Sequence, residues 1–125
     1  MNELVIRLPA TARAARLLRH AVREHLGPDG HPDAELCVTE LLSNVITHLG
    51  AGTPVTLRVS GGRSGSGRAA RTRVELTDPD PRARPVRREA TGTDESGRGL
   101  ALLEAVALRW GVTEGYRTRT VWCEL

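Results

Sequence analysis

The chain has 125 residues, 39% of them hydrophobic and 26% charged, and a formal net charge of +3, which is the composition of one soluble globular domain over residues 1–125. It contains no apolar run of the roughly 20 residues that a membrane span needs and no signal segment at its start, so a cytoplasmic location without membrane attachment is expected. All of its basic residues are arginines, but no aromatic stacking platform or recognition motif accompanies them, which argues against direct binding of nucleic acid.

The first half of the chain predicts one strand followed by two helices. Residues 4–9 alternate weakly and are closed by a proline, which is typical of a strand. Thr11 has a suitable side chain for an N-cap, and a helix is expected over residues 11–26, before a Gly-Pro pair. A second helix is expected over residues 32–49, with a proline at an early position and glycines after its end.

The middle of the chain predicts a hairpin and a long loop. Residues 53–59 and 72–78 alternate like strands that bury one face. The Gly/Ser/Arg stretch between them is typical of a flexible hairpin connection. Residues 79–96 hold three of the seven prolines and show no periodicity, which predicts a long loop of the kind that often carries function.

The last part of the chain predicts a helix and a second hairpin. A glycine-rich segment at 97–99 precedes a helical pattern that ends at Gly111. Strands are then expected near 110–114 and 117–124, with a turn at Gly115. This order of elements predicts an α+β fold, a two-layer sandwich with helices on one face of a mostly antiparallel sheet.

The two cysteines, Cys37 and Cys123, stand alone in the sequence, without C-x-x-C or Cys/His spacing. A structural zinc site would need more ligands than these two residues supply. We therefore expect two free thiols, mostly buried.

The second predicted helix carries a polar stripe. Glu40, Asn44 and His48 fall at i, i+4 and i+8, so they share one side of a helix whose other positions are mostly apolar. Taken singly, an acid and an amide at this spacing are commonly a solvated helix edge. Combined with Asp78 at a strand end and a glycine-rich helix start, the stripe predicts a nucleotide site.

Each part of that predicted site has a chemical reason. Backbone N–H groups after Gly97 and Gly99 can hold phosphate oxygens, because the absent side chains allow close approach. Magnesium on a triphosphate takes one or two protein oxygens, and the amide oxygen of Asn44 suits that position. Glu40, one turn earlier, would lie next to the γ-phosphate and could accept a proton from an attacking hydroxyl. The long loop after Asp78 could fold over the nucleotide.

Four segments also resemble the motifs of one family, in that family's order. Residues 33–50, DAELCVTELLSNVITHLG, carry E-x-x-x-N-x-x-x-H, and VELTDPDP, GRGLALLEAVALRWGV and RTVWCEL follow. They resemble the N-box, Asp motif, second glycine box and closing strand of the Bergerat-fold ATPases, which include gyrase, histidine kinases and certain chaperones. The resemblance covers about residues 4–125 and is closest to the small bacterial anti-sigma-factor serine/threonine kinases, which suits the length of the chain.

The resemblance implies a role for each matched residue. Asp78 would contact the adenine amino group, Thr120 would help to hold the adenine, and His48 would close the helix beside the site without acting in the chemistry. The Asp motif of the family usually reads D-x-G-x-G, and here it reads D-P-D-P. The implied set is Glu40 as catalytic base, Asn44 as Mg²⁺ ligand, and Asn44, His48, Asp78, Gly97, Arg98, Gly99, Leu100 and Thr120 as the residues that bind ATP.

Two functions remain open at this point. The resemblance implies a kinase that transfers the γ-phosphoryl group of ATP to a Ser or Thr of an anti-sigma-factor antagonist and that also binds a sigma factor. The alternative is a non-catalytic module, with or without ATP, that regulates a sigma factor through protein contacts. The intact Glu40 and Asn44 favour the kinase, whereas the D-P-D-P motif favours the module. Family members are commonly homodimers, and the resemblance carries that option to this chain.

Overall fold

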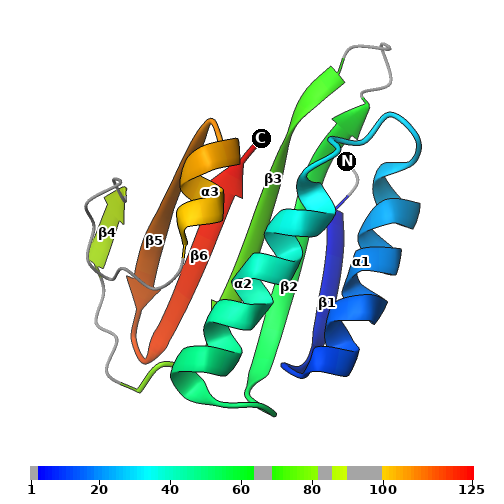
Figure 1. The fold of residues 1–125 in the computed structure, drawn as a ribbon. Coiled ribbons are helices and arrows are strands. Elements are labelled where there is room, and N and C mark those ends of the chain that lie inside the picture. The colour runs from blue at the N-terminus through cyan, green and yellow to red at the C-terminus, as the bar shows by residue number, and fades with distance from the viewer. Residues whose placement is uncertain (1–2, 64–68, 82–85, 90–99) are drawn as a thin grey trace.

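Three helices cover one face of a six-stranded sheet (Figure 1). The computed structural model describes residues 3–63, 69–81, 86–89 and 100–125. The strands follow the order β1-β2-β3-β6-β5-β4, and every neighbouring pair is antiparallel. This arrangement confirms the predicted α+β sandwich. The elements are β1 (Glu3–Pro9), α1 (Ala12–Leu26), α2 (Ala34–Leu49), β2 (Pro54–Arg63), β3 (Ala69–Asp78), β4 (Val86–Glu89), α3 (Ala101–Val106), β5 (Arg109–Gly115) and β6 (Thr118–Glu124).

The two long helices lie close to their predicted positions. Thr11 caps α1, its hydroxyl oxygen accepting a hydrogen bond from the Ala14 N–H at 3.0 Å. α2 begins at Ala34, slightly later than predicted, because His31 Nδ1 accepts from the Asp33 N–H at 3.0 Å and holds the preceding residues in a turn. Across the part of the chain that is described, none of the helices has the length and hydrophobicity that a membrane crossing needs.

The core fills the layer between the helices and the sheet. Because side chains alternate along a strand, every second residue of the central strands faces the helices, as the sequence pattern predicted. Full burial of one such Leu or Val side chain contributes about 1.5–3 kcal/mol. The largest fully buried apolar side chains are Leu18 and Val22 of α1, Val38, Leu41, Leu42 and Val45 of α2, Leu57 and Val59 of β2, Val74 and Leu76 of β3, and Leu103 of α3.

The two cysteines meet in this core. Cys37 of α2 and Cys123 of β6 are free and fully buried, which confirms the prediction. Their side chains hydrogen-bond to each other, and this bond together with burial raises the pKa of the Cys123 thiol above its ordinary value. Cys123 therefore stays protonated at neutral pH.

The β2–β3 hairpin reaches further than predicted. Pairing continues into the Gly/Ser/Arg stretch as far as Arg63 opposite Ala69, past a bulge at Gly61. Gly61 has a φ of +100°, and a Cβ atom there would lie 1.9 Å from the carbonyl oxygen of Arg71. The bulge therefore requires glycine, and a stretch of glycine and serine carries no alternation from which the strands could have been read.

A fourth strand lies inside the segment predicted as a long loop. β4 pairs with β5, with Val86 opposite Glu114 and Glu89 opposite Gly111. It forms the edge of the sheet beyond β5 (Figure 1). Residues 82–85 and 90–96 of the predicted loop are outside the described residues.

α3 is shorter than predicted. It ends at Val106 and not at Gly111. After Val106 the backbone pairs with β6 instead of continuing the helix. The Leu108 N–H donates to the carbonyl oxygen of Glu124 at 2.8 Å, and β5 begins at Arg109. The helical pattern of the sequence ran on because the first residues of β5 are also compatible with a helix face.

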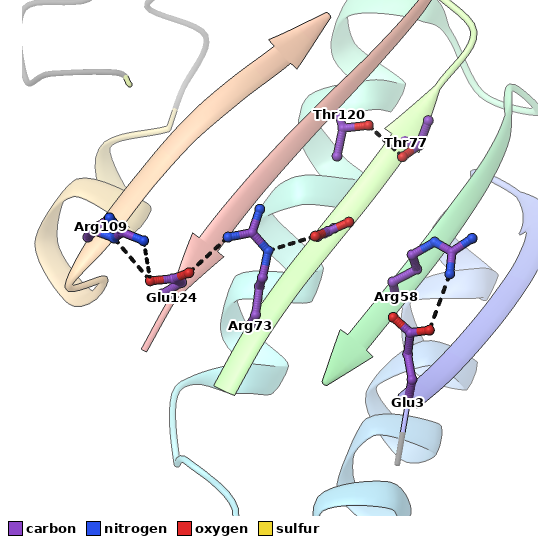
Figure 2. Close-up of polar contacts among 8 residues, drawn as sticks. Glu3, Arg58, Arg73, Thr77, Arg109, Thr120 and Glu124 are labelled. Atoms are coloured by element: carbon purple, nitrogen blue, oxygen red, sulfur yellow. Dashed lines mark hydrogen bonds and ion pairs between the residues drawn. The ribbon is translucent and has the colours of Figure 1, made fainter. Parts of the chain in front are cut away.

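The opposite face of the sheet carries polar side chains in rows set by the strand register. One row consists of four threonines that are successive partners across β2, β3, β6 and β5: Thr56, Thr77, Thr120 and Thr113. In a second row, Arg73 bonds to Glu75 at 2.6 Å and to Glu124 at 2.9 Å, and Arg109 also pairs with Glu124 at 2.9 Å. Figure 2 shows this face, with the helices behind the strands.

Candidate functional site

The polar stripe of α2 runs from the core to the surface. Asn44 is 4% exposed and is flanked in the helix by the buried Leu41 and Val45. Glu40 is half-buried and His48 is exposed. Because these three residues are spaced four apart, they lie on one side of α2, as predicted. The amide is thereby held in the fold, while the carboxylate of Glu40 remains accessible to a ligand.

Asp78 ends β3 on the side of the sheet that faces the helices. It is 1% exposed and shares its strand face with Leu76 and Val74 of the core. Its Oδ2 accepts hydrogen bonds from Arg119, from Nη2 at 3.2 Å and from Nε at 3.4 Å. Its Oδ1 is buried and has no hydrogen-bond partner in the part of the chain that the structure describes. Leaving a buried acceptor unsatisfied costs about 1–3 kcal/mol, so this oxygen requires a functional explanation.

The charges around Asp78 oppose one another. Burial raises the pKa of the Asp78 carboxyl above its ordinary value, and the guanidinium of Arg119 only partly counteracts it. The neighbouring carboxylates of Asp80 and Glu114 raise that pKa further. A buried carboxyl with a perturbed pKa and a specific charged partner is typical of functional sites.

The structure places Thr120 on the other face of the sheet from Asp78. Thr120 is the register partner of Thr77, and their hydroxyl oxygens are 2.7 Å apart on the opposite face of the sheet (Figure 2). The residue opposite Asp78 is Arg119, which is 4% exposed. Strand parity could have found it, since Arg119 is two residues before the core residue Val121 and must share its face.

The glycine-rich part of the predicted site is outside the described residues. Gly97, Arg98 and Gly99 belong to that part of the chain. Leu100 is described; it is 5% exposed, it precedes the first turn of α3, and its carbonyl oxygen accepts from the Glu104 N–H at 3.2 Å. Its side chain therefore joins the core and fixes where the glycine-rich segment ends.

A hollow of about 490 Å³ lies at the same end of the sheet but on the other face. Thr56 and Thr77 line it, and both belong to the threonine row, away from the helices. Neither Glu40 nor Asn44 contributes to it. It is thus separate from the predicted nucleotide site, although Asp78 borders both. Its further lining residues are Arg7, Leu8, Pro9, Pro54, Val55, Pro79 and Thr118.

Comparisons with known proteins agree with this fold. The uncharacterised protein SCO4941 of Streptomyces coelicolor is 52% identical over 88 residues, which is 70% of this chain and 79% of that protein. A solved structure of the RsbU and RsbW domains of Rv1364c from Mycobacterium tuberculosis has a TM-score of 0.65 at 20% identity, covering 99% of this chain. This chain spans 32% of that one, and at such low identity the likeness shows the fold alone.

The family model described as a histidine kinase-like ATPase domain matches residues 7–122. The match includes α2 with its polar stripe, Asp78 and Arg119, and it leaves out only short terminal segments. The chain therefore belongs to the histidine kinase-like ATPase domain family.

Proposed function

We propose that this protein is a cytoplasmic, ATP-dependent kinase that transfers the γ-phosphoryl group to a Ser or Thr of an anti-sigma-factor antagonist. Membership of the ATPase domain family implies ATP binding. The observation that carries the nucleotide site is the buried Oδ1 of Asp78, which has no hydrogen-bond partner among the described residues. The exocyclic amino group of adenine is a donor that would satisfy it.

The donors of the α2 stripe suit magnesium on a triphosphate. Mg²⁺ prefers oxygen ligands and usually takes one or two from the protein, with phosphate and water in the remaining positions. Asn44 would supply an amide oxygen from its fixed position in α2. Among the described residues no group of three His, Cys, Asp or Glu side chains gathers, which agrees with a metal held mostly by phosphate. The bound ion would neutralise charge on the phosphates.

In this proposal Glu40 is the general base. The hydroxyl oxygen of the substrate would bond to the γ-phosphorus while the bond from that phosphorus to the oxygen of ADP breaks. Glu40 would take the hydroxyl proton. Because phosphoryl transfer depends mainly on positioning and charge neutralisation, this small set of residues can suffice. Backbone N–H groups of Gly97, Arg98, Gly99 and Leu100 would hold the phosphates, and His48 would close the helix beside them.

The protein partners belong to the same proposal. The solved structure with the similar fold contains a domain called RsbW, and the sequence resembles anti-sigma-factor kinases. The partners would be an antagonist protein as substrate and a sigma factor as the second binding partner. Phosphorylation of the antagonist would then decide which of the two the protein holds.

Two features of the site favour a second candidate, a regulator without kinase activity. In the Asp motif, Asp80 and Arg82 stand where the family usually has glycines, with Pro79 and Pro81 at the intervening positions. In addition, Arg119 already engages one oxygen of Asp78. Such a protein would keep the fold and bind its partners without phosphorylating them.

Calorimetric titration of ATP tests the proposal first. We expect Mg²⁺-dependent binding with a Kd near 1 μM, roughly 8 kcal/mol. Asn44→Ala should lose the magnesium dependence, whereas Ser43→Ala, at an exposed position of the same helix, is the matched control and should retain it. Absence of binding at millimolar ATP in the wild-type protein would refute the nucleotide site. ATP binding without phosphorylation of any antagonist would favour the non-catalytic regulator.

A further inference from the structure

Arg119 contacts the Asp78 carboxylate from one side only. The register of β3 and β6 places the two residues opposite each other, and both side chains are almost fully buried. Nη2 and Nε both donate to the same oxygen, Oδ2, at 3.2 and 3.4 Å. Arginine frequently binds a carboxylate with one donor to each oxygen. Here no group of the described residues bonds to Oδ1, so one oxygen of Asp78 is committed to the protein and one remains for a ligand.

The number of available carboxylate oxygens determines which purine such a site can hold. Adenine presents a single exocyclic amino donor beside a ring nitrogen that accepts, so one carboxylate oxygen is enough. Guanine presents its ring N1–H and its 2-amino group side by side, and a carboxylate matches both only with two oxygens. With Oδ2 engaged by Arg119, Asp78 offers one acceptor.

We propose that Arg119 determines the base specificity of the nucleotide site: by occupying Oδ2 of Asp78 it leaves one acceptor, which selects adenine over guanine. The inference rests on the proposed function, since it requires that the Asp78 site binds a nucleotide base. Arg119 need not touch the base, and acts as a positioning residue through Asp78.

Arg119 also affects the contact between Asp78 and the base by favouring the ionised form of the Asp78 carboxyl. Within the described residues, the carboxylates that act on Asp78 are Asp80, just after β3, and Glu114 of β5, and the cation is Arg119 of β6. Burial and the two carboxylates favour a protonated Asp78, whereas Arg119 favours the ionised form. A protonated carboxyl would present an O–H donor toward the base amino group. Removal of Arg119 should therefore shift the acid loss of ATP binding to a higher pH.

The test compares base preference in four proteins: wild type, Arg119→Met, Arg119→Lys and Thr118→Val. Met has a similar length but no donor, and Lys keeps the charge. Thr118→Val is the matched control, at an exposed position on the other face of the same strand. Binding of ATP, GTP and inosine triphosphate with Mg²⁺ is measured by calorimetry between pH 5 and 8. Inosine triphosphate has the N1–H of guanine without the 2-amino group.

In the wild type we expect ATP to bind at least about 10-fold more tightly than GTP, because the second guanine donor finds no acceptor. Inosine triphosphate, which lacks the second donor, should bind more tightly than GTP. Arg119→Met should lower the preference for ATP about 10-fold, make GTP tighter than inosine triphosphate and move the pH midpoint of ATP binding upward. Arg119→Lys should restore the pH midpoint, and Thr118→Val should match the wild type.

The outcomes separate this inference from the proposed function. If the wild type binds none of the three nucleotides, the nucleotide site is refuted and the role of Arg119 with it. If the wild type binds ATP but a folded Arg119→Met protein keeps the same base preference and pH midpoint, only the role of Arg119 is refuted. Should Arg119→Met not fold, the wild type still decides: GTP binding as tightly as inosine triphosphate, or about 10-fold more tightly, would overturn the inference, and tighter binding of inosine triphosphate than of GTP would support it.

Discussion

The buried pair of Asp78 and Arg119 should be strongly coupled in stability. Its side chains are 0% and 5% exposed, so neither charge can be solvated by water if its partner is lost. Removing one partner of a buried pair typically costs about 3–5 kcal/mol. We therefore expect this loss for Asp78→Ala and for Arg119→Met singly, which corresponds to a fall in Tm of roughly 10–20 °C for a chain of this size.

The double variant should lose much less than the sum of the two single losses, because no uncompensated charge remains in the core. A coupling free energy of about 2–3 kcal/mol is expected from urea unfolding at pH 7 without nucleotide. The pair of Arg58 and Glu3 is the matched control, since its side chains are 42% and 47% exposed and lie 3.3 Å apart (Figure 2). Its cycle should give about 0–1 kcal/mol. Additivity within about 0.5 kcal/mol at Asp78 and Arg119 would refute this reasoning.

Three further predictions concern catalysis, the backbone and acid stability. Glu40→Gln should lower phosphoryl transfer about 10²–10⁴-fold while calorimetry shows ATP binding retained, and equal transfer rates would remove Glu40 from the role of base. Gly61→Ala should lose at least about 1 kcal/mol more in urea unfolding than Gly50→Ala, because both have a positive φ but only a Cβ at Gly61 meets backbone. Burial alone would raise the pKa of Glu124, but hydrogen bonds from Arg109 and Arg73 lower it below its ordinary value of 4.5. The ionised Glu124 therefore stabilises the folded protein above pH 4.5, and this contribution is lost as the pH falls through the lower pKa that Glu124 has in the folded state. In Glu124→Gln, the free energy of unfolding should therefore fall less between pH 6 and pH 3 than in the wild type. An equal fall in both proteins would contradict the stabilising role of the contacts between Glu124 and the two arginines.

The elements that bury one face could be predicted from the sequence, because burial imposes a period. Leu18 and Val22 of α1 and Leu57 and Val59 of β2 follow the helical and strand periods and lie in the core. The cap at Thr11 could be predicted as well, because a threonine directly before a helical pattern is a preferred N-cap residue. β4 and the bulge at Gly61 carry no such period, since they depend on pairing with distant strands.

In the candidate site, too, features set within one element could be predicted, whereas features set by the pairing of distant strands could not. The stripe of Glu40, Asn44 and His48 could be read from the spacing, because one helix determines its geometry. The partner of Asp78 could not be found from motif position alone, since it depends on the register between β3 and β6. The motif pointed to Thr120, whereas the register placed Arg119 there. Tertiary pairing decided between two adjacent residues that have opposite orientations.

The thiol pair in the core offers a built-in reporter of local opening. Cys37 belongs to the helix that carries Asn44, and it packs with Cys123 at full burial, so a thiol reagent can reach either sulfur only after α2 separates from the sheet. The labelling rate then measures the population of opened molecules rather than ordinary surface reactivity. A ligand that binds only the closed form should slow labelling by the factor 1 + [L]/Kd. ATP, GTP and any protein partner could thus be ranked on the unmodified chain, with no attached dye and no substitution.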